Sequence, residues 1–113
     1  MAGHVITFKT QERRVCAEPN EITVKEGDIV VFWNDTDETV EIAPDQDAFD
    51  RMTSAPTVFS VNPNGGLCKT VGGTLKAPAE GTYVELHPTV DDTPVLGCGG
   101  MGDHRGPGMQ VNP

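Results

Sequence analysis

The sequence predicts an all-β domain, a sandwich or a barrel, and two observations carry this prediction. Apolar and polar residues alternate along most of the chain, as in strands with one face in a core, and no segment sustains a helical period. The 13 glycines and 9 prolines are spread between these segments as turn residues. Seven to eight short strands at this spacing are typical of such folds. We find no internal repeat and no linker, and therefore expect one domain over residues 1–113.

The strands of the first half are predicted from alternation and from one β-branched run. Residues 4–9 and 21–25 alternate, so every second side chain should face the core. Residues 29–33 read Ile-Val-Val-Phe-Trp, a composition typical of a central strand. Alternation returns over residues 39–42 and is expected to end at Pro44.

The second half begins irregularly and then returns to strands. One short helical turn is expected over residues 47–52. The longest strand of this half is expected over residues 82–90, with Tyr83, Glu85 and His87 on one face. After this strand the chain is glycine-rich to its end and should form an extended loop. Shorter strands are expected before it at residues 57–61, 67–71 and 74–76.

The charge of the chain excludes several classes of partner. Seventeen acidic and eight basic residues give a formal net charge of −9, which repels nucleic-acid backbones and anionic membrane surfaces. No apolar stretch approaches the roughly 20 residues of a membrane helix, so no membrane insertion is expected. The start of the chain shows no signal-peptide pattern, which predicts either a cytoplasmic protein or a mature exported domain. The acidic surface would suit solubility alone, or docking to a basic redox or assembly partner protein.

The chain has three cysteines, at positions 16, 68 and 98, so at least one lies outside any intramolecular disulfide. Cys16 and Cys68 could be bridged in an oxidising compartment. In a reducing compartment all three would be free thiols. The sequence leaves both alternatives open.

Three blocks in order resemble the cupredoxin family, and together they span about four-fifths of the chain. Residues 19–34 contain a proline bend, a strand, a Gly-Asp turn and a second strand that ends in aromatic residues and Asn34. Residues 76–83 resemble the family's Pro-Ala-Gly-x-Tyr approach to its metal-bearing strand, and residues 104–109 resemble its His-x-Gly-x-Gly-Met segment. The resemblance implies a single Greek-key β-sandwich in which Tyr83 packs inward at a corner.

The same resemblance implies a copper site that carries single electrons, held by two imidazoles, a thiolate and a weak thioether. Cys98, His104 and Met109 occur in the family's order, and His87 would supply the second imidazole by pointing inward beside Tyr83. The chain departs from the family in four ways. Residues 34–44 contain no histidine, and His87 stands where the family has its cysteine. The loop from Cys98 to His104 is longer, and few residues follow Met109 to form a last strand.

Other functions remain open at this stage. A metal-free cupredoxin-like module, acting as a protein-interaction or assembly subunit, is the main alternative, because the family's first histidine is missing. A structural zinc site could use His87, Cys98 and His104, with Cys68 as a further ligand. An enzyme is not expected, because the sequence has no Gly-x-Ser-x-Gly motif and places no nucleophile beside Glu85 and His87.

Overall fold

The structure is a computed structural model that describes residues 2–49, 58–72, 77–99 and 106–113. Within these ranges the chain forms strands and turns, and it contains no helix that could cross a membrane. The predicted all-β class is therefore confirmed. The twelve strands found in the described ranges are β1 (Gly3–Gln11), β2 (Arg14–Glu18), β3 (Glu21–Lys25), β4 (Ile29–Asp35), β5 (Val40–Ile42), β6 (Phe59–Val61), β7 (Gly65–Thr70), β8 (Thr82–Glu85), β9 (Thr89–Val90), β10 (Thr93–Pro94), β11 (Leu96–Gly97) and β12 (Gly108–Asn112).

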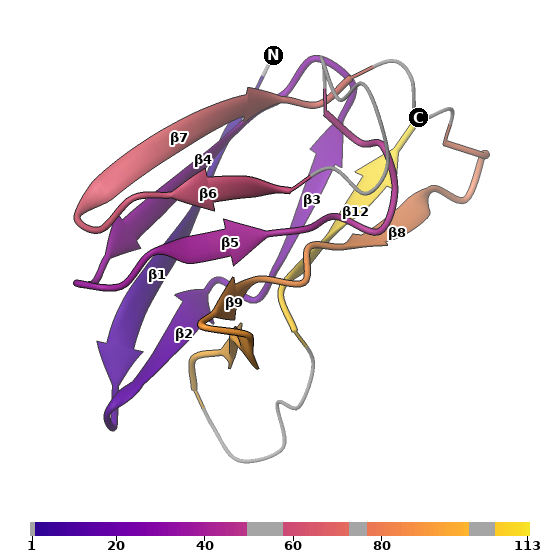
Figure 1. Ribbon diagram of the computed structural model, residues 1–113. Helices are drawn as coiled ribbons and strands as arrows, with labels where there is room; N and C mark the ends of the chain where they lie inside the picture. The colour runs from indigo at the N-terminus through magenta and orange to yellow at the C-terminus, as the bar shows by residue number, and fades with distance from the viewer. Residues whose placement is uncertain (1, 50–57, 73–76, 100–105) are drawn as a thin grey trace.

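The largest sheet has five strands in the order β11-β2-β1-β4-β7. β1 and β2 form an antiparallel hairpin, whereas β1 and β4 run parallel and β4 pairs antiparallel with β7. The parallel pair brings the start of the chain beside the β-branched run, which the sequence had predicted as a central strand. Two smaller sheets, β10-β9-β5-β6 and β3-β12-β8, complete the sandwich, and Figure 1 shows β5 and β6 on one side of β1 and β4.

The core lies between the sheets and is built from the alternating positions. Ile22 and Val24 of β3 are buried, as are Val40 and Ile42 of β5, so the predicted inward faces of these strands are confirmed. Three phenylalanine rings meet in the core at centroid separations of 5.5 to 6.0 Å, a spacing at which aromatic pairs add to the energy of burial: Phe32, Phe49 and Phe59.

The side chain of Asn34, at the end of β4, forms hydrogen bonds with the segment that follows β4 and with β6. Its side-chain Nδ2 donates hydrogen bonds to the carbonyl oxygens of Glu38 at 2.6 Å and of Val61 at 3.1 Å. Its Oδ1 accepts hydrogen bonds from the backbone N–H and the hydroxyl of Thr36. The side chain is fully buried, so a buried amide here replaces the water that these groups would otherwise bind.

The last segments of the chain differ from the expectation. Residues 82–90 form two strands, β8 and β9, because the backbone of His87 has a φ of 46°, which interrupts the extended conformation. The few residues after Met109 do form a final strand: β12 lies between β3 and β8 and pairs with both. The predicted strand at 74–76 and residues 50–52 of the predicted helical turn lie outside the described residues. Residues 47–49 are described and are not helical, and Phe49 forms an isolated β-bridge with Val71.

Candidate metal centre

Cys98, predicted as the thiolate ligand, is bonded to Cys16 in a disulfide. The pairing follows from the fold, because β11 runs parallel to β2 and sets Leu96 beside Cys16, with a hydrogen bond from the N–H of Cys98 to the carbonyl of Ala17 at 2.8 Å. A sulfur in a disulfide has no thiolate charge for copper. The Cys16–Cys68 pairing considered from the sequence is wrong, since Cys68 is an exposed free cysteine.

Met109, predicted as the thioether ligand, is fully buried in the core. It lies on β12 opposite Val84 of β8, and paired residues of neighbouring strands share a face of the sheet. The inward face of β8 therefore carries Val84 and not the tyrosine beside it. The half-buried Tyr83 lies on the outward face, where its phenol covers Gly108, so the expected inward tyrosine is also wrong.

His87 points away from the core, and its side chain is 54% exposed. The prediction that it points inward beside Tyr83 is wrong, although the prediction that it shares a face with Glu85 is confirmed. Its Nε2 lies 3.3 Å from Oε2 of Glu85. Because Met109 points into the core and His87 points into solvent, one ion could not take both as ligands. His104, the remaining predicted ligand, lies outside the described residues.

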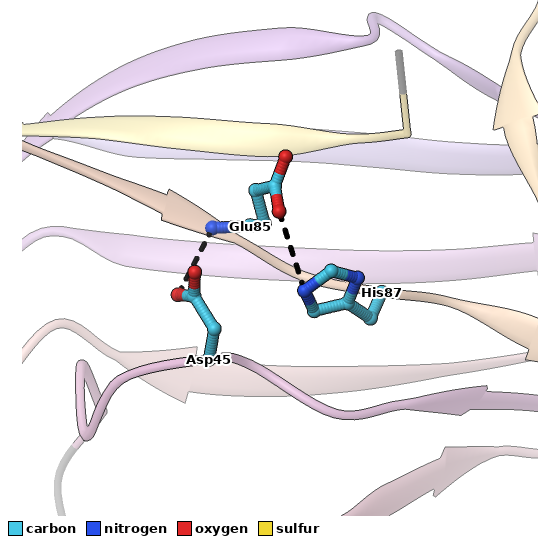
Figure 2. Close-up of side chains that lie close together, drawn as sticks. All are labelled: Asp45, Glu85 and His87. Atoms are coloured by element: carbon cyan, nitrogen blue, oxygen red, sulfur yellow. Dashed lines mark hydrogen bonds and ion pairs between the residues drawn. The ribbon is translucent and has the colours of Figure 1, made fainter. Parts of the chain in front are cut away.

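A third potential ligand, the carboxylate of Asp45, joins His87 and Glu85 from a distant part of the chain. Asp45, just after β5, exchanges two hydrogen bonds with Glu85: the N–H of Asp45 donates to the Glu85 carbonyl at 3.0 Å, and Oδ1 of Asp45 accepts from the N–H of Glu85 at 3.2 Å. Figure 2 shows the three side chains gathered on one surface. One potential ligand atom from each lies within 4.8 Å of the others.

The three side chains form one nitrogen and two oxygen donors on an exposed surface. Two donors bound to one transition-metal ion at about 2.0–2.2 Å are at most about 4.4 Å apart, so small rotations of these exposed side chains would suffice to bind an ion. The donor set lacks the sulfur that blue copper requires, and it suits a divalent cation that accepts imidazole and carboxylate. The zinc set considered from the sequence does not fit, because Cys98 is oxidised and Cys68 lies on β7 of the five-stranded sheet.

A pocket of about 180 Å³ opens beside His87. Two of the residues that line this pocket are joined by a hydrogen bond of 2.8 Å, from the N–H of Val95 to the carbonyl of Pro88. Among its lining residues only Glu85 and His87 have metal-binding side chains, so further coordination positions would be filled from solvent. The lining residues are Glu85, His87, Pro88, Pro94, Val95, Leu96, Gly106 and Pro107.

Sequence reasoning missed Asp45. The signal that could be found locally was the pair Glu85 and His87, which are two residues apart in a predicted strand and so share a face. The third member lies 40 positions earlier, and nothing in its own neighbourhood marks it as a ligand. Only the pairing of the segment after β5 with the end of β8 brings the carboxylate of Asp45 to this surface.

No protein-family model matches the sequence, and no curated protein matches it. The structure matches solved structures of amicyanin, a cupredoxin. A reduced Cu(I) form of an amicyanin mutant at pH 4 matches with a TM-score of 0.52 and 12% sequence identity, over 96% of this chain and 80% of that chain. A second mutant, also with Cu(I), matches with a TM-score of 0.51 and 14% identity over the same shares.

The chain has a cupredoxin-like fold. At 12–14% identity the match concerns the fold alone, so the copper bound by those proteins is a property of theirs. The cupredoxin-like sandwich predicted from three sequence blocks is confirmed by this match. The ligand set that the same blocks implied is not assembled among the described residues, because Cys98 is bonded to Cys16 while Met109 and His87 point in opposite directions.

Proposed function

We propose that this cupredoxin-like protein binds one copper(II) ion on its surface between Asp45, Glu85 and His87. The observation that supports the proposal is the convergence of one imidazole and two carboxylates, with ligand atoms within 4.8 Å of one another. Copper(II) is the cation chosen because, among the divalent metals of the first transition row, it binds a given nitrogen and oxygen site most tightly.

The proposed function is binding of copper(II) rather than transport of electrons. A centre that exchanges electrons readily needs soft ligands that also stabilise copper(I). The surface site has no sulfur ligand, and a disulfide occupies the sulfur of Cys98. Copper(II) held by Asp45, Glu85 and His87 would therefore resist reduction.

The test is a copper(II) titration monitored by electron paramagnetic resonance and visible absorption. The chain has three histidines, so His87→Ala, His4→Gln and His104→Gln are compared with the unchanged protein, and circular dichroism confirms that each variant folds. We expect one copper per chain, weak visible absorption, and an affinity loss of at least about tenfold in His87→Ala alone. The paired carboxylate variants are Glu85→Gln and, as an exposed control in a turn, Glu26→Gln.

Three outcomes would overturn the proposal. If His4→Gln or His104→Gln removes the copper signal and His87→Ala does not, the ion lies elsewhere. An intense visible band that disappears in Cys98→Ser would establish a copper–thiolate site instead. If neither the unchanged protein nor any variant binds copper, the chain is better described as the metal-free cupredoxin-like module.

A further inference from the structure

The asparagines of the chain differ in the residue that follows each of them. Asn64 is followed by glycine, Asn62 and Asn112 by proline, and Asn20 and Asn34 by residues that carry a side chain. The following residue matters because its backbone nitrogen can attack the carboxamide carbon of the asparagine. Glycine has no Cβ to hinder this attack, and the nitrogen of proline has no hydrogen to lose. The sequence therefore makes the carboxamide of Asn64 the most open to attack.

Asn64 lies in the turn that joins β6 of the four-stranded sheet to β7 of the five-stranded sheet (Figure 1). Asn64 and Asn62 are both exposed, so water reaches this turn. Asn34 is a contrasting case, because it is fully buried and its Nδ2 and Oδ1 are both held by hydrogen bonds. The fold thus leaves the reactive carboxamide in solvent.

The backbone of this turn limits the attack without preventing it. Asn64 has a φ of 52°, a left-handed conformation that asparagine accepts more readily than most residues. Its N–H donates to the carbonyl of Thr36 at 3.0 Å, and the N–H of Gly65 donates to the carbonyl of Asn62 at 3.1 Å. The second bond must break before the nitrogen of Gly65 can react. Opening one exposed turn requires less free energy than unfolding the core, so the reaction should proceed from the folded protein.

We propose that Asn64 is a site of spontaneous covalent modification, at which the protein loses ammonia and acquires isoaspartate or aspartate. A bond forms between the nitrogen of Gly65 and Cγ of Asn64, the bond from Cγ to Nδ2 breaks, and ammonia leaves with the hydrogen of the Gly65 N–H. Water then opens the resulting cyclic imide. Addition at Cγ gives aspartate, whereas addition at the backbone carbonyl carbon gives isoaspartate, in which the main chain runs through Cγ. The net reaction consumes one water, releases one ammonia and needs no cofactor.

The product changes two contacts of the turn. Nδ2 of Asn64 donates a hydrogen bond to Oδ1 of Asp37 at 3.3 Å. A carboxylate in its place cannot donate, and it repels the carboxylate of Asp37. Isoaspartate also adds a methylene carbon to the main chain just before Gly65, which pairs with Asn34 at the end of β4. The added atom disturbs the first pair of β7 with β4, so isoaspartate should destabilise the fold more than aspartate does.

The test is incubation of the folded protein in warm, mildly alkaline water enriched in heavy oxygen, followed by peptide mass spectrometry. Asn62 is an internal control, because it is exposed, lies beside the same turn and precedes Pro63. Asn64→Gly is the variant control, since glycine accepts a positive φ and has no carboxamide. We expect conversion at Asn64 to be at least about tenfold faster than at Asn62, with heavy oxygen in the product, because only Asn64 precedes a residue with a free approach to its N–H.

Urea unfolding gives a second readout. Each product has one more negative charge than the unchanged protein, so anion exchange separates the converted fractions. The isoaspartyl fraction should unfold at a lower urea concentration than Asn64→Asp.

Three results would overturn the proposal. If Asn64 stays intact in the folded protein and converts only in urea, the fold blocks the attack. Equal conversion at Asn62 and Asn64 would show that the glycine is not the cause. An isoaspartyl fraction as stable as the unchanged protein would contradict the stated effect on the pairing of β7.

Discussion

Cys16 and Cys98 form a disulfide between β2 and β11, across a sequence separation of 82 residues. The bond covalently links the two-residue strand β11, which is the edge strand of the five-stranded sheet, to its neighbour β2. It also determines the chemistry of the chain, because Cys98 is the sulfur that a blue-copper centre would have needed.

Cys98→Ser should lower the free energy of unfolding by about 2–4 kcal/mol, since the unfolded chain regains the freedom that the long closed loop removed. Urea unfolding under non-reducing conditions measures the change. Cys68→Ser is the control, and as an exposed free thiol it should alter stability by less than about 0.5 kcal/mol. Equal effects of the two variants would contradict a bridge between Cys16 and Cys98.

Acid should destabilise the fold through Asp28. Hydrogen bonds from the N–H groups of Ala2 and Lys25, each at 3.0 Å, and the nearby His4 lower the pKa of the Asp28 carboxyl from 3.8 to about 2. This stabilisation is complete above pH 4 and is lost as the pH falls toward 2, because the unfolded state takes up the proton first.

The measurement for Asp28 is the free energy of unfolding of the unchanged protein and of Asp28→Asn at pH values between 2 and 7. Asp28→Asn should be less stable at neutral pH, and the difference between the two proteins should shrink below pH 4. A difference that stays constant down to pH 2 would show that the charge of Asp28 has no part in the fold.

Asn34→Ala should destabilise the protein by about 2–3 kcal/mol. The variant leaves the buried carbonyl of Val61 without the hydrogen bond from Nδ2 and removes the acceptor of two donors on Thr36. Thermal and urea unfolding report the loss. Asn62→Ala, at an exposed asparagine, should have an effect below about 0.5 kcal/mol. Similar effects at both positions would argue against the buried network.

Gly108→Ala should cost about 1–3 kcal/mol, because the new methyl group would overlap the phenol of Tyr83. Gly3→Ala is the matched control, since a Cβ at Gly3 meets nothing within 4 Å. Urea unfolding of both variants checks this prediction. If Gly108→Ala is as stable as Gly3→Ala, the phenol of Tyr83 does not cover this part of β12.

The predicted metal ligands were wrong where the folding of the chain, and not the local sequence, sets the partner or the orientation of a side chain. Cys98 was assigned from its order along the chain, but its partner Cys16 comes from the opposite end of the sequence. His87 was expected to point inward, but the core-facing positions of its segment are those of Val84 and Leu86. Alternation shows which residues share a face, and it does not show which of the two faces is buried when both carry bulky side chains.

Local sequence patterns were enough to predict the class of the fold and most of the strands, because the two-residue period of a strand is a local property of φ and ψ. Ile22, Val24, Val40 and Ile42 are buried as their patterns predicted. The pairing of the strands, the disulfide between Cys16 and Cys98, and the approach of Asp45 to Glu85 and His87 could be seen only in the folded chain. These contacts link residues far apart in the chain, and they depend on the packing of the whole core, which no local pattern records.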